Sequence, residues 1–481
     1  MSKPSEDAKG HQPAAGDVAK DASDSIRYVN LYESEDKIYT RYINGFYNKI
    51  RKYTGIPLLL GYLLVPWFTI DNRPAMLFDL GERKFHIFWM TFWPQDGMYL
   101  AWLLIISAFA LFTVTMIAGR VWCGYTCPQT VWTMMFMWVE RHAEGDRNKR
   151  IKLDQAPWGV NKIWRKTLKH TGWILIGFIT GLTWVGYFTP IKALTFELLT
   201  FEANLIAVFW VLFFTGMTYL NAGWLREQVC KYMCPYARFQ AVMYDQDTLA
   251  VQYDEARGES RGPRKATDDY KAQGLGDCID CSWCVQVCPV DIDIRDGLQY
   301  ECINCGLCVD ACNSVMDKVG YERGLISYTS EDILLTGKNH WWKRWRLWGY
   351  LALTLIMVSV FIFNIADRMP LTVDVARDRG NSMFRIRGPN VQNVYTIKIN
   401  NMDDKAHRFN VEVEGDLAYS VDGYKALPID AGELFTVPIR VLAPRKDITQ
   451  SKNTIYIRVT AKDNPELTDE HKAVFVGPDR K

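Results

Sequence analysis

"DCIDCSWCVQVCPVDIDIRDGLQYECINCGLCVDAC" (residues 277–312) contains one cysteine spacing twice. Two runs share the spacing Cys-x2-Cys-x2-Cys-x3-Cys: Cys278, Cys281, Cys284 and Cys288, then Cys302, Cys305, Cys308 and Cys312. This spacing is typical of bacterial two-cluster ferredoxins, in which three cysteines of each run hold one iron–sulfur cluster and the fourth reaches the other cluster. The stretch therefore predicts a ferredoxin-like module with two [4Fe-4S] clusters.

Crossed ligation divides these cysteines into two sets. The first cluster set is Cys278, Cys281, Cys284 and Cys312. The second cluster set is Cys302, Cys305, Cys308 and Cys288. A structural zinc module is the alternative, but it usually places pairs of cysteines on either side of a long spacer. The second run ends in Cys-Asn instead of Cys-Pro, which leaves the predicted ligands unchanged.

The remaining cysteines form two matching pairs, in "RVWCGYTCPQTVW" (120–132) and "REQVCKYMCPYARF" (226–239). Each pair follows an apolar stretch, an Ala-Gly dipeptide and an arginine, which indicates an internal repeat. Proline after the second cysteine can start a helix, whose positive end stabilises a thiolate and favours redox or soft-metal chemistry. If the repeats pack around a pseudo-two-fold axis, the pairs form one four-thiolate site: Cys123, Cys127, Cys230 and Cys234.

Two other interpretations of these motifs stay open. A single cysteine at a helix end more often packs as a small apolar residue. Methionines near the pairs could act as thioether ligands of Cu(I), although each one alone is more often a packing residue. These methionines are Met134, Met135, Met137, Met233 and Met243.

The chain of 481 residues also contains five apolar stretches without a charged residue: 53–70, 97–119, 171–191, 203–225 and 347–366. Each is about long enough for a helix to cross a bilayer core of roughly 30 Å, and Trp and Tyr lie near their ends. Helices buried in a large soluble core are the alternative. Because the stretches also lack histidine, a haem or an ion relay inside the bilayer has no residues to form it.

Basic residues predict the orientation of these helices. The connection 120–169 carries ten Lys or Arg, whereas the connections 71–96 and 192–202 carry four together. By the positive-inside rule, the N-terminus, the 120–169 connection and the cysteine module are cytoplasmic, and the C-terminal region lies outside. Cytoplasmic thiols stay reduced, which favours metal-bound cysteines over disulfides. The polar residues 1–40 predict a disordered cytoplasmic tail.

Beyond the fifth stretch, short segments such as "VYTIKINN" and "RFNVEVEG" alternate apolar and polar residues between turn-forming residues. They predict a small antiparallel β-sandwich with a docking or structural role. The fold class is therefore a polytopic α-helical membrane protein with five membrane helices, an inserted ferredoxin-like module and a C-terminal Ig-like sandwich. Its net charge of +2 indicates no nucleic-acid partner.

The whole arrangement resembles the FixG/CcoG (RdxA) family of cytochrome oxidase accessory proteins. The shared features include both Cys-x3-Cys-Pro motifs, "YDEARGESRG" (253–262) and "IDIRDGLQYECINC" (292–305), with Ser260 at a position where the family pattern has proline. The resemblance implies these regions: a tail (1–40), a four-helix membrane region (41–245), a linker and two-cluster module (246–340), a fifth membrane helix (341–367) and a periplasmic Ig-like domain (368–481).

The resemblance also implies a function in the bacterial inner membrane. Such a protein would reduce Cu(II) to Cu(I), its substrate ion, for assembly of a cbb-type cytochrome c oxidase, and the paired motifs would be its copper-handling cysteines. Its expected partners are the assembly factors and copper carriers of that oxidase, and a second copy of the chain in a homodimer. Two alternatives are an electron-transfer subunit, which relays electrons from quinol or a cytoplasmic donor to a partner reductase, and a non-enzymatic assembly scaffold.

Overall fold

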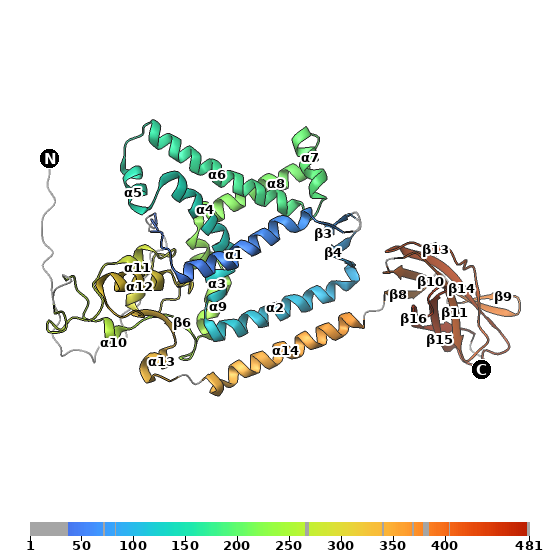
Figure 1. Cartoon of the computed structure of the whole chain (residues 1–481). Coiled ribbons are helices and arrows are strands. Elements are labelled where there is room, and N and C mark those ends of the chain that lie inside the picture. The colour runs from blue at the N-terminus through green and yellow to red at the C-terminus, as the bar shows by residue number, and fades with distance from the viewer. Residues whose placement is uncertain are drawn as a thin grey trace, which may run out of the picture. The chain divides into compact units, whose positions relative to one another are not determined.

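The computed structural model describes residues 37–70, 73–81, 83–264, 269–338, 341–367, 370–378, 384–403 and 405–478. Three helical spans in this part of the chain are long and apolar enough to cross a membrane. They are α2 (Gly97–Ala118), α8 (Leu205–Thr218) continued by the π-helical segment η3 (Tyr219–Leu225), and α14 (Trp345–Ala366) (Figure 1). Residues 1–36 of the predicted disordered tail lie outside the described residues.

The prediction of five spans is therefore confirmed for three, whereas the helices of the other two stretches do not reach this length and hydropathy. Both remaining stretches are helical, in α1 (Phe46–Leu64) and α6 (Val160–Val185). Both helices start earlier than the apolar stretches, so their first turns carry basic residues. Helix α1 also ends at Leu64, because the chain turns into the short 3-10 helix η1 (Val65–Trp67), which contains Pro66.

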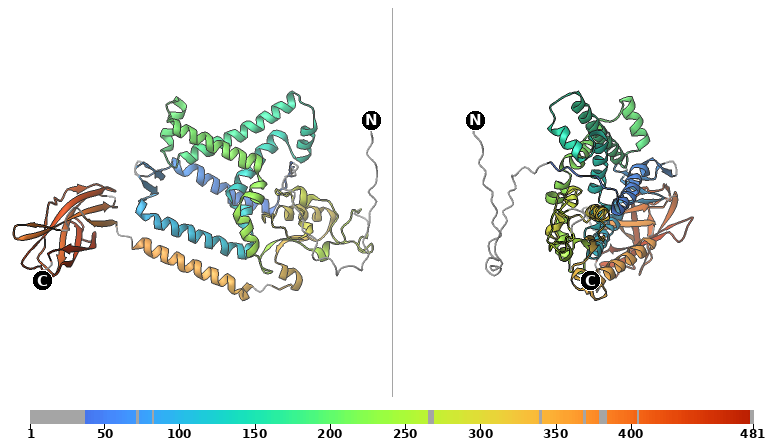
Figure 2. Two further views of the ribbon diagram at one scale, coloured as in Figure 1. Left: turned by 180° about the vertical axis from the view of Figure 1, so that it is seen from behind. Right: turned by 60° about the vertical axis from the view of Figure 1, so that its left-hand side comes forward.

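The apolar helices pack in pairs: α2 and α14 share a hydrogen bond, and α6 and α8 meet at small residues. Figures 1 and 2 show α2 beside α14, where Tyr99 Oη donates to the carbonyl oxygen of Asn364 (3.2 Å). Helix α6 packs on α8 through Gly177 and Gly181. A Cβ atom at Gly181 would lie 2.6 Å from the carbonyl oxygen of Val211. The Gly-x3-Gly spacing thus lets the two backbones approach closely.

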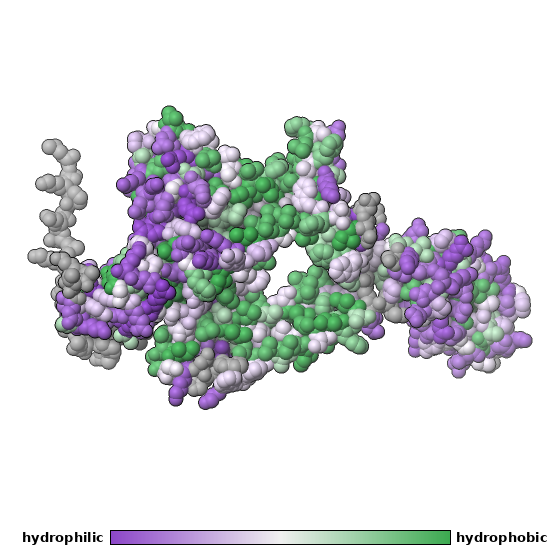
Figure 3. Space-filling model, viewed as in Figure 1, coloured by the Kyte–Doolittle hydropathy of each residue, from purple (hydrophilic) through white to green (hydrophobic). Residues whose placement is uncertain are grey.

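Apolar side chains also cover the outside of these helices. Figure 3 shows a hydrophobic surface over α2, α14, α6 and α8. Exposed residues on it include Leu104, Ile174, Phe209 and Ile356. A surface of this kind is stable against lipid hydrocarbon and unfavourable in water, which supports membrane association of the chain.

A short segment between α1 and α2 forms a sheet that the sequence analysis did not predict. Strands β3 (Met76–Asp79), β4 (Lys84–Ile87) and β5 (Met90–Phe92) pair in that order, and β1 (Thr69–Ile70) pairs with β2 (Arg73–Pro74). Asp96 accepts a hydrogen bond from the backbone nitrogen of Trp93 (2.9 Å) just before α2 begins. The segment therefore leads directly into a membrane span.

The two Cys-x3-Cys-Pro motifs lie on short helices that follow apolar helices. Helix α3 (Val121–Tyr125) and helix α4 (Pro128–Glu144) follow α2, and α5 (Arg147–Gln155) precedes α6. Helix α7 (Ile191–Thr200) precedes α8. After η3 come the π-helical turn η4 (Val229–Met233) and α9 (Pro235–Met243). Each repeat therefore has the same order: apolar helix, short cysteine-bearing turn, and a helix that begins with proline.

The cysteine-rich module lies between α9 and α14. Its strands β6 (Ala250–Tyr253) and β7 (Ile326–Thr329) are antiparallel and lie before and after the cysteine loops in the sequence. Between them are the helices α10 (Glu255–Gly258), α11 (Trp283–Gln286) and α12 (Leu307–Val319), and α13 (Glu331–Thr336) follows β7. Asp310 of α12 accepts hydrogen bonds from the backbone nitrogens of Tyr47 and Asn48 at the start of α1 (3.2 and 2.9 Å). Arg344 donates to Asp245 (2.8 Å) just before α14 begins. Both contacts fix the module to the helices.

The C-terminal region is the predicted β-sandwich. One sheet has the order β12-β14-β10-β8, with β9 on β10, and the other has the order β13-β11-β15-β16. Tyr395, Phe409 and Phe475 are fully buried in the core between the sheets. The strands are β8 (Leu371–Arg377), β9 (Arg385–Arg387), β10 (Asn390–Asn401), β11 (His407–Gly415), β12 (Ser420–Asp422), β13 (Pro428–Ile429), β14 (Leu434–Pro444), β15 (Lys452–Ala461) and β16 (Thr468–Val476).

Candidate redox site

The first cluster set lines one cavity of the module. Its four cysteines surround this cavity together with apolar side chains such as Val315 and Leu325: Cys278, Cys281, Cys284 and Cys312. Cys312 reaches it from α12, whereas the other three come from the loop and α11. The structure thus places a cysteine of the second run with three cysteines of the first.

The second cluster set lines a neighbouring cavity. Its members surround a second apolar space, which Val290 and Ile303 also border: Cys288, Cys302, Cys305 and Cys308. Cys284 lines both cavities, so the two spaces lie next to each other. Cys308 and Cys312 are one turn apart on α12, and each faces a different cavity. One helix therefore contributes a thiol to both sets.

Burial raises the pKa of several thiols in both sets. It raises the pKa of Cys284 to about 11 and that of Cys312 to about 12. Burial also raises the pKa of Cys302 to about 12, although the backbone amide of Asn304 and the Arg120 guanidinium lower it. Neighbouring thiols of the same set raise the pKa of Cys312 and Cys308 further. Thiolates this close repel one another, so a positively charged group must lie between them to stabilise their deprotonated form.

This donor set fits a [4Fe-4S] cluster. Such a cluster takes four cysteine thiolates in a mostly apolar pocket, and each cavity offers four cysteines and otherwise mainly apolar walls. Glycine and asparagine permit the tight loops: Gly306 and Asn304 both have positive φ, of 70° and 51°. No group of three or more His, Cys, Asp or Glu side chains in the described ranges is placed to hold a single metal ion.

The paired motifs come together between α4 and α9. Cys127 and Cys234 each precede the proline that starts the next helix, α4 and α9 respectively. Burial raises the pKa of Cys123 to about 12, and the thiols of Cys127, Cys230 and Cys234 raise it further, whereas Arg120 lowers it. Burial likewise raises the pKa of Cys230 to about 12. The four thiols of the two pairs therefore act on one another electrostatically.

The contacts around the pairs are reciprocal. Arg120, which precedes the first pair, donates to the carbonyl oxygen of Ala237 in α9. Arg226, which precedes the second pair, donates to Glu140 of α4 (3.0 Å). Gln129 of α4 donates to the carbonyl oxygen of Arg226 (3.0 Å), and Gln240 of α9 accepts from Cys123 Sγ (3.7 Å). Each repeat thus positions the cysteine loop of the other.

Helix α3 packs directly on the loop of the second cluster set. A Cβ atom at Gly124 would lie 2.7 Å from the carbonyl oxygen of Ile303 and 3.0 Å from Cα of Cys305. Tyr125 Oη donates to the carbonyl oxygen of Cys305 (3.3 Å), and Cys123 packs against the apolar cluster that contains Ile303. The first pair and the second cluster set therefore lie side by side.

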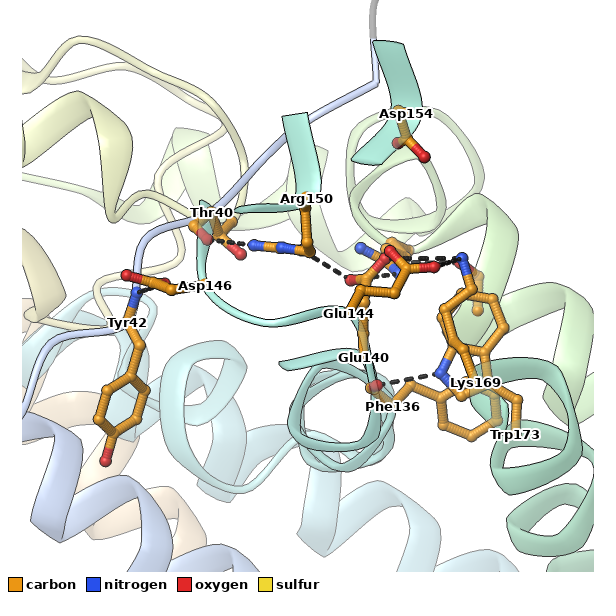
Figure 4. A network of polar contacts seen from close by, with 12 residues as sticks. Thr40, Tyr42, Phe136, Glu140, Glu144, Asp146, Arg150, Asp154, Lys169 and Trp173 are labelled. Carbon is orange, nitrogen blue, oxygen red and sulfur yellow. Dashed lines mark hydrogen bonds and ion pairs between the residues drawn. The ribbon is translucent and has the colours of Figure 1, made fainter. Parts of the chain in front are cut away.

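A buried ion network supports this region (Figure 4). Glu140, which is 0% exposed, accepts from Arg150 (2.8 Å) and Arg226 (3.0 Å). Glu144 pairs with Lys169 of α6 (2.9 Å) and with Lys166 (2.8 Å). Since Arg226 begins the second cysteine motif, the network connects α4, α5 and α6 to that motif.

Sequence analysis did not identify several of these residues. Glu140 and Glu144 are ordinary charged residues of an amphipathic stretch, and their partners lie on other helices. Arg120 and Arg226 belong to the predicted repeat, but their contacts with the opposite repeat depend on tertiary packing. Asn304 is 0% exposed beside Cys302, and its backbone oxygen accepts from Tyr328 Oη. The position of Asn304 inside the second cysteine run was the one available signal.

Comparison with known proteins agrees with this architecture. Residues 225–331 match a family described as "4Fe-4S dicluster domain" and residues 100–144 match one described as "4Fe-4S binding domain". Residues 361–478 match the "IG-like fold at C-terminal of FixG". These matches support iron–sulfur clusters and a role in electron transfer.

Similar full-length proteins are also known. Protein RdxB of Cereibacter sphaeroides is 38% identical over 439 residues, which cover 86% of this chain and 90% of that protein. Nitrogen fixation protein FixG of Rhizobium meliloti is 37% identical and covers 80% of both chains. A crystal structure of a FixG-related protein from Vibrio parahaemolyticus is 30% identical over 22% of this chain and 95% of its own, with a TM-score of 0.21.

Protein RdxA of Cereibacter sphaeroides is 37% identical over 462 residues, which are 91% of this chain and 96% of that protein. These relatives align with 80–91% of this chain. The chain therefore belongs to the FixG/RdxA family.

Proposed function

We propose that this protein is a membrane-bound iron–sulfur oxidoreductase that reduces Cu(II) to Cu(I) for assembly of a cbb-type cytochrome c oxidase. The observation that carries the proposal is the contact between the paired motifs and the second cluster set. Gly124 leaves no room for a side chain between α3 and the Ile303–Cys305 backbone. A sulfur site at the pairs is thus adjacent to a set of four cysteines suited to a redox cluster.

In this proposal the two cysteine sets hold the clusters. The first cluster set holds one [4Fe-4S] cluster and the second cluster set holds the other, with Cys312 and Cys288 as the crossed ligands. When bound, the clusters supply electrons one at a time. Apolar residues around both cavities exclude water, and the loops hold the thiols in place before a cluster binds.

Copper is the substrate that receives the electron. Reduction of Cu(II) to Cu(I) needs one electron and neither a proton nor a new covalent bond. Thiolate sulfur selects Cu(I), whereas Cu(II) prefers nitrogen and oxygen in a tetragonal arrangement. Cys123, Cys127, Cys230 and Cys234 would therefore favour the reduced ion, and Arg120 and Gln240 would position Cys123 for it.

The membrane arrangement is also part of the proposal. Helices α1 and α6 would cross the bilayer with the three apolar spans, and their basic first turns would lie at the cytoplasmic surface. The cysteine module would then be cytoplasmic and the sandwich periplasmic. Its partners would be copper carriers and assembly factors of the oxidase, with a homodimer as the working form.

One observation favours a second candidate function. Because residues 100–144 match a 4Fe-4S binding family and contain the first pair, the two pairs could hold a third cluster. The protein would then relay electrons from quinol or a cytoplasmic donor to a partner reductase without copper. Iron analysis separates the two: two clusters give about eight irons per chain, and three give about twelve.

The proposal is tested with protein that has been reduced anaerobically and freed from reductant. Cu(II) is added with a Cu(I)-selective chelator, and the Cu(I) formed is counted. We expect the wild type to form Cu(I) and the Cys230→Ser/Cys234→Ser variant to form almost none while it keeps its iron. Failure of the reduced wild type to form Cu(I) would refute cupric reduction, and clusters that accept no electrons would favour a scaffold.

A further inference from the structure

We propose that Met134, Met137 and Cys230 form a Cu(I)-binding site inside a cavity between α4, η4 and the cysteine module. The inference rests on the proposed function, because it takes copper as the substrate. It goes further by assigning two thioethers to the site and by placing that site on one side of the second cluster set. The ligand class is a soft monovalent cation.

Three segments form the walls of this cavity. Helix α4 contributes one face, on which Thr130, Met134 and Met137 lie. The second cysteine motif contributes Glu227 and Cys230 from the turn η4 and the residues before it. The cysteine module closes the third side. Sulfur-bearing residues from two segments of the chain therefore line the same space.

The wall on the module side is shared with the second cluster set. Val290 and Ile303 border this cavity, and both also border the cavity of the second cluster set. Val290 is 3% exposed and Ile303 is 5% exposed, so both are packed between the two spaces. An ion at Met134, Met137 and Cys230 would thus be separated from that cysteine set by one layer of side chains.

The structure distinguishes among the methionines near the pairs. Met134 and Met137 are three residues apart, so they lie on the same side of α4. Met135 lies between them in sequence and does not line this cavity. The Cε atom of Met134 lies beside Gly55 of α1, since a Cβ atom at Gly55 would be 3.4 Å from it. Helix α1 thus packs next to this thioether.

The charges around the cavity favour Cu(I) over Cu(II). Arg51 and Arg226 line it beside Glu227. Arg226 pairs with Glu140 (3.0 Å), and Arg51 Nε donates to the carbonyl oxygen of Gly124 (3.0 Å). Guanidinium groups repel a divalent ion more strongly than a monovalent one. The guanidinium groups and the sulfur ligands therefore both favour Cu(I) relative to Cu(II).

The test measures affinity rather than turnover. Full-length protein with its clusters intact is titrated anaerobically with Cu(I) against a Cu(I)-selective chelator. We expect the Met134→Leu/Met137→Leu variant to bind Cu(I) more weakly, by at least about tenfold, the lower end of what even an outer-shell change costs a metal site. Leucine keeps nearly the volume of methionine, so folding should be preserved. Met135→Leu is the matched control and should bind Cu(I) like the wild type.

A second readout does not depend on the affinity of a variant. Selenomethionine-labelled protein loaded with Cu(I) should show selenium next to copper in X-ray absorption. The signal should persist in Met135→Leu and disappear in Met134→Leu/Met137→Leu. Absence of selenium next to bound copper in the wild type would overturn the inference.

The outcomes separate this inference from the proposed function. Wild-type affinity in Met134→Leu/Met137→Leu, together with loss of affinity in Cys230→Ser, would show that both thioethers are packing residues and leave cupric reduction intact. Bound Cu(I) that neither variant affects would place the site elsewhere. A wild type that neither binds nor forms Cu(I) would refute the proposed function itself.

Discussion

Cys312 is the residue on which crossed ligation depends. It follows Cys308 by one turn of α12, yet it lines the cavity of the first cluster set, whereas Cys308 lines the other. The spacing alone predicted this division, because three cysteines on a tight loop cannot also span the following helix. The residues that surround the thiols were not predictable, since Gln240 reaches Cys123, and Arg120 reaches Cys302, only through tertiary packing.

The variant Cys312→Ser tests the division directly. Loss of this thiol should damage the cluster whose other ligands are Cys278, Cys281 and Cys284, because a cubane with three thiolates is labile. Iron analysis and low-temperature paramagnetic resonance of the reduced protein measure which cluster remains. Cys308→Ser is the comparison and should damage the other cluster. Loss confined to the cluster of Cys302, Cys305 and Cys308 in Cys312→Ser would contradict the crossed assignment.

Gly124 is a second residue on which the proposed electron transfer depends, because it lies against the loop of the second cluster set. A Cβ atom there would meet the backbone of Ile303 at 2.7 Å and that of Cys305 at 3.0 Å, and neither backbone can rotate away. Gly124→Ala should therefore displace α3 from the module and slow Cu(I) formation, by up to about a hundredfold for a shift of 1 Å. Gly61→Ala is the control, because nothing lies within 4 Å of its added Cβ. Equal rates for the two variants would show that the contact has no role in electron delivery.

At the level of elements, α4 connects the two halves of the site. Its N-terminus follows the first pair, its middle presents Met134 to the cavity, and its C-terminal half carries Glu140 and Glu144. The sequence predicted a helix here, because the proline after the second cysteine can start one. It could not predict the ion network, because Lys169 lies in the first half of α6, beyond α5 and outside the apolar stretch.

Glu140→Ala should destabilise this arrangement. Removal of a buried partner leaves the Arg150 and Arg226 guanidinium groups without their carboxylate, which typically costs about 3–5 kcal/mol. Thermal unfolding in detergent measures the loss as a lower midpoint. Arg323→Ala, which removes an exposed pair with Asp317, should leave the midpoint nearly unchanged. An unchanged midpoint in Glu140→Ala would mean that the network contributes little to stability.

Helices α1 and α6 show why charge-free stretches alone did not predict which helices meet the length and hydropathy of a candidate span. A charge-free stretch predicts hydrophobicity but not where its helix begins, and α6 starts at Val160, before several lysines. The sandwich was easier to predict, because several of its strands alternate clearly, as in β15 with its buried residues at every second position. Helix ends depend on capping and packing, which are harder to predict from the sequence.

At the scale of the whole molecule, the proposal places the cysteine module and the sandwich on opposite sides of the membrane. Reporter fusions at positions 145 and 300 should therefore behave as cytoplasmic, and a fusion at 420 should behave as exported. An odd number of crossings between the module and the sandwich is sufficient for this result, and α14 provides one. A cytoplasmic signal at 420 would contradict the topology.

In the proposed function, electrons held by the two clusters pass to Cu(II) at the paired motifs. The most direct measurement mixes pre-reduced protein with Cu(II) and a Cu(I)-selective chelator without oxygen, and follows the visible absorbance of the clusters and of the chelate together. We expect the clusters to return to their oxidised absorbance as Cu(I) appears, with one Cu(I) for each electron released. We expect Cys230→Ser/Cys234→Ser to uncouple the two signals. Clusters that remain reduced while Cu(II) is present in excess would contradict the proposed function.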